Sequence, residues 1–492
     1  ITCRDWSSDV CSSDLSVLLM LPALGQAWQQ RGAYTIEARL DTVEHKIHAT
    51  QHLRYYNNSP DTLYSVWFHL YPNAYRDLSS HFAKEAEQQQ DYRLRYSRPE
   101  DRGWIEVNSL IVSGNPAELK YGTEYEPPRR PSYGRSYDLT IFGDPRPISI
   151  DTAESNAFLA YRKSKQPKNK LDSTSASLEL PIPLAPGDSV DFDFDFTVKV
   201  PKFFSRLGHA GTHYEISQWY PKIAVYDEQG WHADGYHYIG EFYGDYGSFQ
   251  VGLTVPRGFV VGASGQEVTD RSDSLDNCGQ ETYLLFAGDD IHDFAWCADP
   301  GYQEIAELHG EVAIRVLFLP EHREQWKNVM QYAKDALDYC GRWYGPYPYP
   351  SLTLCDGDMA AGGGMEYPNL VIISTGEDKY TRTLEMAVMH EIGHQWFYGM
   401  LGNNEMDEAW LDEGINSFSE QRYFQEKYGP HGNYLANDFL ARILPEVSNR
   451  NVGRYLPYLY SSNRMDQHIS TKACLSGEIG QYAASAYMKP AA

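Results

Sequence analysis

The sequence predicts a multidomain protein in which a large antiparallel β domain is followed by an α/β domain. Apolar residues recur at every second position through much of the first three hundred residues, whereas helical spacing dominates after Pro320. Of the 492 residues, 42% are hydrophobic and 14% aromatic, which excludes global disorder. We place the β domain at residues 28–315 and the α/β domain at residues 316–492.

The first 27 residues stand apart from both domains. Residues 1–15 have no basic start and no periodicity, and Asp5–Leu15 resembles the in-frame translation of a common sequencing-adapter oligonucleotide. We interpret them as a non-native leader; a natural leader rich in Ser, Asp and Cys is the alternative. Residues 16–27 form an apolar run ending in small residues, typical of the second half of a secretory signal peptide, with a short buried helix as the alternative. We therefore expect an exported chain, periplasmic or extracellular, whose mature form begins near Trp28.

The β domain is predicted from alternating runs, of which residues 190–200 are the clearest. In VDFDFDFTVKV every second residue is apolar and the others are polar, which indicates a half-buried strand ended by Pro201. Similar runs occur at residues 34–40, 65–70, 249–255 and 312–319. Polar insertions interrupt them at residues 81–103, 122–137 and 162–170, and we interpret the last, basic run as a solvated loop.

The second domain is predicted to alternate helices and strands. Helical spacing covers residues 321–344, and turn-rich GPYPYP at 345–350 leads into a strand at 351–355. A second strand is expected at 370–374, followed by helices at about 381–399 and 408–427. The change from β to α/β character falls near residues 310–320.

Charge and composition exclude several function classes. The formal net charge is −25, and an acidic chain repels nucleic-acid phosphates, so we expect no nucleic-acid partner. No stretch reaches the ~20 apolar residues that a membrane-spanning helix needs. The seven cysteines include no C-x-x-C pair, which argues against a disulfide scaffold and a thiolate zinc site.

A metal site is predicted where His390 and His394 enclose Glu391 in the pattern H-E-x-x-H. Residues four apart share one face of a helix, so both imidazoles can bind one ion. A catalytic zinc takes a third protein ligand, and Glu413 lies on the next predicted helix, from which a helical hairpin can return its carboxylate. We therefore expect one Zn²⁺ per chain, held by two histidines and a glutamate.

Glu391 lies beside these ligands and is predicted to act as the general base. Zinc lowers the pKa of a bound water toward ~7, and a neighbouring carboxylate can take its proton as the water attacks a carbonyl. This interpretation makes the protein a zinc hydrolase.

These residues and a second motif resemble peptidase family M1, the zinc aminopeptidases related to membrane alanyl aminopeptidase and leukotriene-A-four hydrolase. Gly363, Gly364, Met365 and Glu366 are similar to the family's G-x-M-E-N edge strand, to which an extended peptide adds by backbone pairing. The resemblance implies that Glu366 binds the free α-amine of the substrate. It also implies a saddle-like β domain followed by a thermolysin-like catalytic domain that is incomplete at its C-terminus.

Two further segments extend the resemblance. Tyr487 begins a stretch like the family's Y-x-K-G-A, whose Tyr stabilises the oxyanion of the tetrahedral intermediate. Gln218 begins a stretch like Q-F-E-P and is expected at the substrate, but Tyr220 replaces the acidic residue that gives many members a second amine contact. Asp412 replaces the usual Asn before the third ligand, and Tyr367 replaces the Asn of G-x-M-E-N.

The leading hypothesis is an exported zinc aminopeptidase that removes N-terminal residues from peptide substrates. A thermolysin-like endopeptidase or a non-peptide hydrolase on the same site is the second hypothesis, and a non-catalytic binding or scaffold homologue is the third. The sequence leaves open the preferred N-terminal residue and the oligomeric state.

Overall fold

The computed structural model describes residues 28–122, 172–269, 279–359, 363–374, 379–429, 433–444, 447–448, 469–473, 476 and 482–491. The predicted leader, the signal-peptide segment and the basic loop at 162–170 lie outside these ranges. In the described part, no helix is both long enough and apolar enough to span a membrane.

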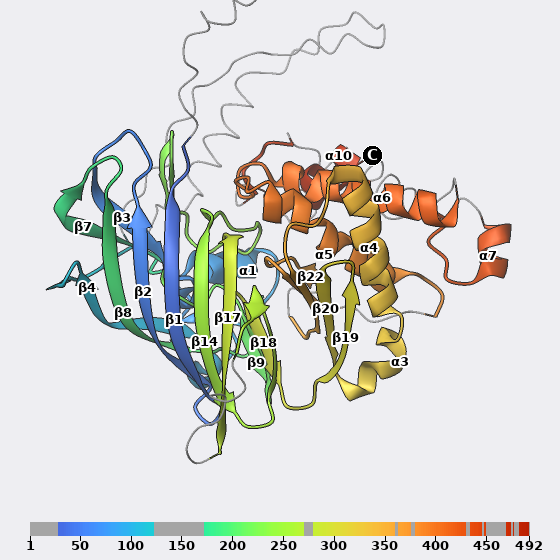
Figure 1. Ribbon diagram of the computed structural model, residues 1–492, viewed down its shortest axis with the longest axis horizontal. Helices are drawn as coiled ribbons and strands as arrows, with labels where there is room; N and C mark the ends of the chain where they lie inside the picture. Colours follow the sequence, from blue (N-terminus) through green and yellow to red (C-terminus); the bar gives the residue numbers. More distant parts are fainter. Residues whose placement is uncertain are drawn as a thin grey trace, which may run out of the picture.

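An eight-stranded sheet forms one side of the molecule (Figure 1). The predicted strand at residues 190–200 is β8 (Ser189–Lys199), where Phe192, Phe194 and Phe196 are buried and the aspartates between them face outward. Asp191 accepts two hydrogen bonds from Arg54 on the neighbouring strand β2 (Lys46–Tyr56). In spatial order the strands are β16 (Gln266–Glu267), β17 (Glu281–Ile291), β14 (Gly247–Pro256), β1 (Arg31–Asp41), β2 (Lys46–Tyr56), β8 (Ser189–Lys199), β4 (Trp104–Val112) and β5 (Asn115–Pro116).

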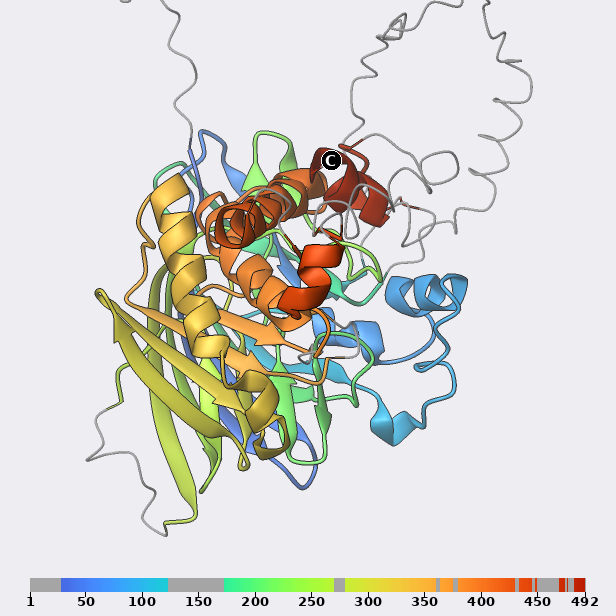
Figure 2. The same cartoon turned by 90° about the vertical axis from the view of Figure 1, so that its right-hand side faces the viewer.

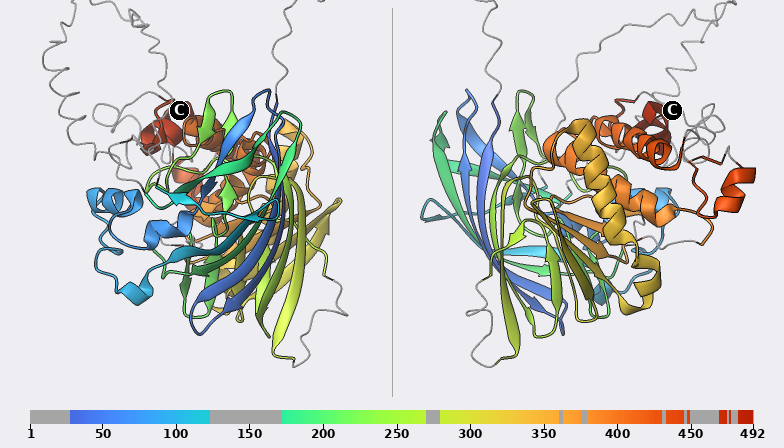
Figure 3. Two further views of the ribbon diagram at one scale, coloured as in Figure 1. Left: turned by 90° about the vertical axis from the view of Figure 1, so that its left-hand side faces the viewer. Right: turned by 45° about the vertical axis from the view of Figure 1, so that its right-hand side comes forward.

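This sheet is not wholly antiparallel, which corrects the prediction. β1 and β14 pair in parallel, with Tyr34 opposite Phe249, and the other ladders of this sheet are antiparallel. Parallel neighbours need a long connection, and the strands β2 to β13 all lie between β1 and β14 in sequence. The alternation of apolar and polar residues predicts a strand, but it does not show which other strand pairs with it. Figure 3 shows the strong twist of this sheet.

Two smaller four-stranded sheets and a hairpin complete the β domain. One sheet consists of β15 (Val260–Ala263), β18 (Trp296–Asp299), β10 (His213–Ile216) and β9 (Gly208–Ala210). The other sheet consists of β11 (Lys222–Ile223), β3 (Leu63–His69), β7 (Ser175–Leu184) and β6 (Lys120–Tyr121). The hairpin consists of β12 (Val225–Asp227) and β13 (Gly230–His232). The polar insertion at 81–103 begins with the short helix α1 (His81–Gln88), flanked by the 3₁₀ turns η2 (Tyr71–Tyr75) and η3 (Pro99–Asp101).

The second domain contains a five-stranded sheet that begins earlier than predicted. Its order is β19 (Gln303–His309), β20 (Val312–Phe318), β21 (Ser351–Asp356), β23 (Leu370–Ile373) and β22 (Gly364–Met365). β19 pairs with β20, and β20 pairs in parallel with β21, so both strands belong to this sheet; the expected boundary after residue 315 falls within β20. The short strand β22 lies at the sheet edge, antiparallel to β23.

Helices cover one face of this sheet (Figures 1 and 2). The predicted helix at 321–344 is interrupted into η4 (Pro320–His322), α3 (Arg323–Trp326) and α4 (Val329–Tyr344). The predicted helix at 381–399 is α5 (Thr383–Gly393), which is followed by the irregular turn η5 (Gln395–Met400). The predicted helix at about 408–427 consists of η6 (Trp410–Gly414), continued by α6 (Ile415–Tyr428). Farther on lie α7 (Asp438–Ile443), η9 (Ala484–Met488) and α10 (Lys489–Ala491).

The five-stranded sheet is buried on both faces. Ile314, Leu352 and Val371 pack with α4, α5 and α6 on one side. On the other side, Leu317, Cys355 and Ile372 pack with Ala295 and Cys297 of the β domain. The five-stranded sheet is therefore held between its own helices and a sheet of the β domain.

Candidate active site

Helix α5 supplies the two histidines and Glu391. Its apolar residues Leu384, Val388 and Ile392 are buried in the core between helices and sheet. That packing turns the opposite face toward a cavity. His390 lies in the last turn of α5 and His394 at its C-cap, and their Nε2 atoms are 3.1 Å apart.

Glu413 returns to these imidazoles from η6, as the sequence predicts. Its Oε2 lies 3.1 Å from Nε2 of His390 and 3.4 Å from Nε2 of His394. The amide of Asn416 donates a 2.7 Å hydrogen bond to the backbone carbonyl of His390, which ties α6 to α5. This close approach depends on Gly393, because a Cβ there would lie 2.0 Å from the Asn416 Oδ1.

The three ligand atoms fit a zinc ion. Ligands on a tetrahedron of radius 2.0–2.1 Å lie roughly 3.3–3.4 Å apart, close to the observed separations. The charges around these atoms also favour a bound cation. Burial would raise the pKa of Glu413, but hydrogen bonds with His390 and His394 lower it. Burial opposes a charged His390, yet Glu413 and Glu420 raise its pKa to about 9.

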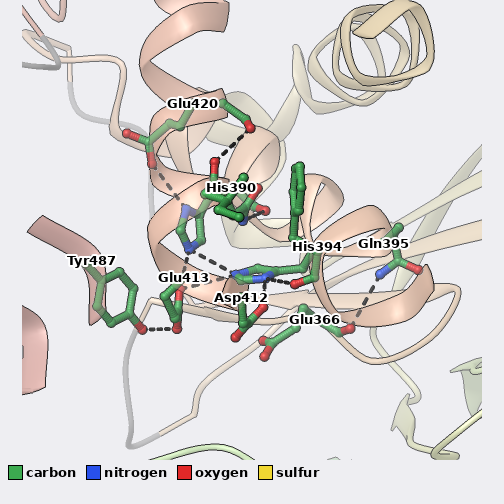
Figure 4. A network of polar contacts seen from close by, with 12 residues as sticks. Glu366, His390, His394, Gln395, Asp412, Glu413, Glu420 and Tyr487 are labelled. Carbon is green, nitrogen blue, oxygen red and sulfur yellow. Dashed lines mark hydrogen bonds and ion pairs between the residues drawn. The ribbon is translucent and has the colours of Figure 1, made fainter. Parts of the chain in front are cut away.

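Each imidazole also faces a carboxylate on its outer side (Figure 4). Asp412 Oδ1 lies 2.5 Å from Nδ1 of His394, and Glu420 Oε2 lies 3.3 Å from Nδ1 of His390. Such partners fix the ring orientation and raise the basicity of the coordinating nitrogen. Sequence reasoning recorded Asp412 only as a departure from the family pattern and did not identify Glu420. Glu420 lies seven positions after Glu413 on one helical run, about two turns, and that spacing was the available signal.

Glu391 projects into the same cavity beside the edge strand. A Cβ at Gly364 would lie only 2.4 Å from the Glu391 carboxyl carbon, so the glycine permits this contact. Burial raises the pKa of Glu391 to about 7, and a cation on the three ligands would lower it again.

The edge strand β22 brings the predicted substrate motif to the cavity. Gly363, Gly364, Met365 and Glu366 all line it. The Glu366 carboxylate is buried, and its oxygen belongs to a group with His394 and Asp412 whose ligand atoms lie within 4.8 Å of one another. Gln395 donates to the Glu366 backbone carbonyl, which links the strand to the end of α5 (Figure 4).

Tyr487 reaches the metal ligands from η9, at the far end of the described chain (Figure 4). Its hydroxyl donates to Glu413 Oε1, and its ring stacks on His390 with centroids 6.1 Å apart. Tyr482 also lines the cavity and meets Tyr487 edge to face. The structure therefore brings together His390, Glu391, His394, Glu413, Glu366 and Tyr487.

Gln218 is the exception among the predicted residues. It is buried in the β domain, where its amide donates a 2.5 Å hydrogen bond to Asp293, and it is not among the cavity-lining residues. Tyr220 donates to the same Asp293 at 2.9 Å. This position corrects the expectation that Gln218 contacts the substrate. The backbone of Gln218 is left-handed, with a φ of 53°, and its side chain is directed into the core toward the buried Asp293.

The β domain instead contributes Arg206 and Glu241 to the cavity. The cavity has a volume of about 350 Å³ and is lined by residues of both domains. Arg206 Nη2 donates a 2.5 Å hydrogen bond to Glu241 Oε1, while Glu241 Oε2 is buried without a partner in the described structure. Burial raises the pKa of Glu241 to about 7, against the effect of Arg206. The only sequence signal was a lone acidic residue in the aromatic stretch Tyr236–Tyr243.

Comparisons with known proteins agree with this geometry. Residues 328–470 match the profile described as the peptidase family M1 domain. The chain is 26% identical over 156 residues to probable aminopeptidase 2 of Sulfurisphaera tokodaii, which is 30% of this chain and 19% of that protein. It is 30% identical over 115 residues to aminopeptidase RNPEPL1 of Homo sapiens, 22% of this chain and 13% of that protein. The chain spans about a fifth of the length of the curated relatives that it matches over the longest segments.

Solved structures show the same fold. The M1 zinc metallopeptidase from Deinococcus radiodurans superposes with a TM-score of 0.55 at 14% identity, over 96% of this chain and 82% of that one. A mutant of that protein, bound to a Tyr-Ser-Ala substrate, superposes with a TM-score of 0.52 at 13% identity, over 94% of this chain and 81% of that one.

Proposed function

We propose that this chain is an aminopeptidase that removes N-terminal residues from peptides, because residues 328–470 match the peptidase family M1 domain and the fold resembles that of an M1 zinc metallopeptidase. The observation that carries the proposal is a cavity holding both the zinc ligands and two further carboxylates, Glu366 and Glu241. We also infer that the N-terminal sheets correspond to the family's saddle-like domain and the helical part to its thermolysin-like catalytic domain.

The metal site would be formed by His390, His394 and Glu413. Zinc bound there supplies a Lewis acid that polarises the scissile carbonyl and lowers the pKa of an attacking water. Asp412 and Glu420 hold the two imidazoles in the orientation that presents both Nε2 atoms to one point.

Glu391 would accept the proton of the attacking water and pass it to the leaving amine. Its position against Gly364 supports this role, because a peptide paired with β22 runs past that carboxylate. Tyr487 would donate a hydrogen bond to the oxyanion of the tetrahedral intermediate. In the structure its hydroxyl donates to Glu413, so it already lies at the ligands.

Restriction to chain ends would come from Glu366 together with Glu241. A free α-ammonium between two buried carboxylates gains charge-assisted hydrogen bonds that an acetylated end lacks. Glu241 Oε2 is buried without a partner in the described structure, so it is available to such a donor, and Arg206 holds the other oxygen. We propose that Glu241, rather than a residue near Gln218, provides the second amine contact.

The test compares a free peptide with its N-acetylated form, on zinc-loaded wild type and on Glu366→Gln. We expect the wild type to cleave only the free peptide, and the variant to lose most of this preference while retaining zinc. Equal cleavage of both peptides by the wild type would support the endopeptidase alternative. A protein that binds zinc but hydrolyses neither peptide would favour the non-catalytic alternative.

We further propose that the chain is exported. The support is the apolar run at residues 16–27, which lies outside the described residues. Expression with this run in a bacterium should yield a mature protein beginning near Trp28, and intact-mass measurement would detect an uncleaved chain.

A further inference from the structure

Two buried cysteines meet where the β domain packs against the catalytic sheet. Cys297 lies on β18 and Cys355 on β21, so the two thiols belong to different sheets and different domains. Both side chains have 0% exposure and share one apolar cluster. Both are free thiols in the structure. Neither takes part in the proposed reaction.

Gly262 shows how closely the thiols approach. Gly262 is the cross-strand partner of Cys297 in the β15–β18 ladder, so side chains at these two positions point to the same face. A Cβ at Gly262 would lie 2.6 Å from the Cys355 Sγ. Because position 262 has no side chain, the Cys355 sulfur lies directly against the backbone beside Cys297.

The surroundings also bring the two sulfurs together. Burial, and then a hydrogen bond with the Cys355 thiol, raise the pKa of Cys297 well above its usual value. The other cross-strand neighbour of Cys297 is Glu215, a carboxylate rather than a thiol, whose Oε1 lies 3.0 Å from Nε2 of His213 and accepts a hydrogen bond from the backbone N–H of Asp358. Among the described residues, Cys355 is therefore the reaction partner that the fold offers to Cys297.

We infer that Cys297 and Cys355 form a disulfide that joins the β domain covalently to the catalytic domain. The reaction is a thiol–disulfide exchange with an external disulfide such as glutathione disulfide. One cysteine thiolate attacks that disulfide and releases one thiol, and the second cysteine displaces the other. The two cysteines are oxidised by two electrons, one disulfide is reduced to two thiols, and both protons leave on those thiols.

The position of the bond gives it a structural consequence at the substrate edge. Cys355 is two residues before Gly357, and the chain then passes through Asp358 to β22, which carries Gly364 and leads into Glu366. The disulfide would fix the strand that precedes this segment to the β domain. It would close a loop of about 60 residues, which restricts the unfolded chain.

The timing of the reaction follows from burial. Exchange needs a thiolate that an oxidant can reach, and both sulfurs are inaccessible in the folded protein. We expect oxidation to be fast while the chain folds and slow once the two domains have closed.

The test uses the full wild-type chain, refolded once with excess glutathione disulfide and once with dithiothreitol. Each sample is denatured at low pH, labelled with a maleimide at neutral pH, and mapped by peptide mass spectrometry. We expect a linked Cys297–Cys355 peptide pair after oxidative refolding and two labelled cysteines after reductive refolding. Cys340, buried on α4 in a different apolar cluster, is the matched control and should be labelled in both samples.

A second measurement compares thermal unfolding of the two samples. The oxidised wild type should unfold several degrees above the reduced one, whereas Cys297→Ala should show no such redox-dependent difference. Maleimide on both Cys297 and Cys355 after oxidative refolding, or a cross-link from either to another cysteine, would overturn the assignment.

Discussion

The two walls of the active-site cavity arise in different ways. The helical wall carries His390, Glu391, His394 and Glu413, which lie within one short stretch of sequence on α5 and η6. The β-domain wall carries Arg206 and Glu241, which come from connections between strands of separate sheets. The helical wall could be predicted from the sequence because its residues follow helical periodicity. The β-domain wall could not, because its loops are positioned by strand pairing between distant segments.

The two walls also hold their charges differently. In the helical wall, imidazoles lie between inner and outer carboxylates and converge on the proposed metal site. In the β-domain wall, one guanidinium is paired with one carboxylate that keeps an oxygen free. We therefore expect changes in the helical wall to affect the chemical step, and changes in the β-domain wall to affect which substrate is bound.

The largest effect is expected for Glu391→Gln. The amide keeps the size of the side chain but cannot accept a proton, so kcat should fall by about 10³-fold. Zinc content, measured by elemental analysis, should be unchanged. A zinc-replete variant with nearly normal kcat would remove Glu391 from the role of general base.

Tyr487→Phe should give the next largest loss. Removing a single oxyanion donor typically lowers kcat by about 10²–10³-fold, with little change in KM. Tyr482→Phe is the matched control, since Tyr482 lines the same cavity but forms no hydrogen bond through its hydroxyl in the described structure. If kcat fell equally in the two variants, the loss would not be specific to the Tyr487 hydroxyl, and Tyr487 would lose its role as the oxyanion donor.

Glu241→Gln should separate the two walls most directly. The loss of one charge-assisted contact to the substrate ammonium should lower kcat/KM by about 10–100-fold, chiefly through KM. Hydrolysis of a free peptide at saturating substrate should remain close to wild type. If kcat falls while KM stays constant, Glu241 belongs to the chemistry of the helical wall instead.

A buried ion triad in the β domain, formed by His213, Glu215 and Asp299, predicts a pH dependence of stability. Hydrogen bonds to Asp299 and Glu215 overcome the effect of burial and raise the pKa of His213 to about 10. Because the folded pKa exceeds the ordinary value of 6.5, the stabilisation is complete below about pH 6.5 and is lost as the pH rises through 10. Urea unfolding of wild type and His213→Gln should therefore show a difference in unfolding free energy that narrows between pH 6.5 and 10. If the difference in unfolding free energy stayed constant over this range, His213 would not be protonated in the folded protein.

The smallest effect on activity is expected for Gln218→Leu. Asp293 would lose a buried hydrogen bond, which should lower the free energy of unfolding by about 1–3 kcal/mol. KM for a free peptide should not change, because Gln218 is not among the cavity-lining residues. A raised KM with normal stability would restore the original prediction for this residue.

Predictions from sequence succeeded where the determining contact is local. Alternation identified β8 and its buried phenylalanines, and the four-residue spacing of His390 and His394 required only a helix. They fell short where the partner is distant. The parallel pairing of β1 with β14, and the inclusion of β19 and β20 in the catalytic sheet, depend on which strands meet.

Local sequence patterns were sufficient to predict the candidate reactive centre: two imidazoles one helical turn apart, a carboxylate between them and a third proposed ligand on the following helix. The surroundings of that centre depend on how distant segments pack. This packing turned Gln218 into the core, brought Glu241 and Arg206 into the cavity, and set Cys355 against Cys297 across the domain boundary. The physical reason is that backbone periodicity acts over a few residues, whereas these contacts depend on how whole sheets pack.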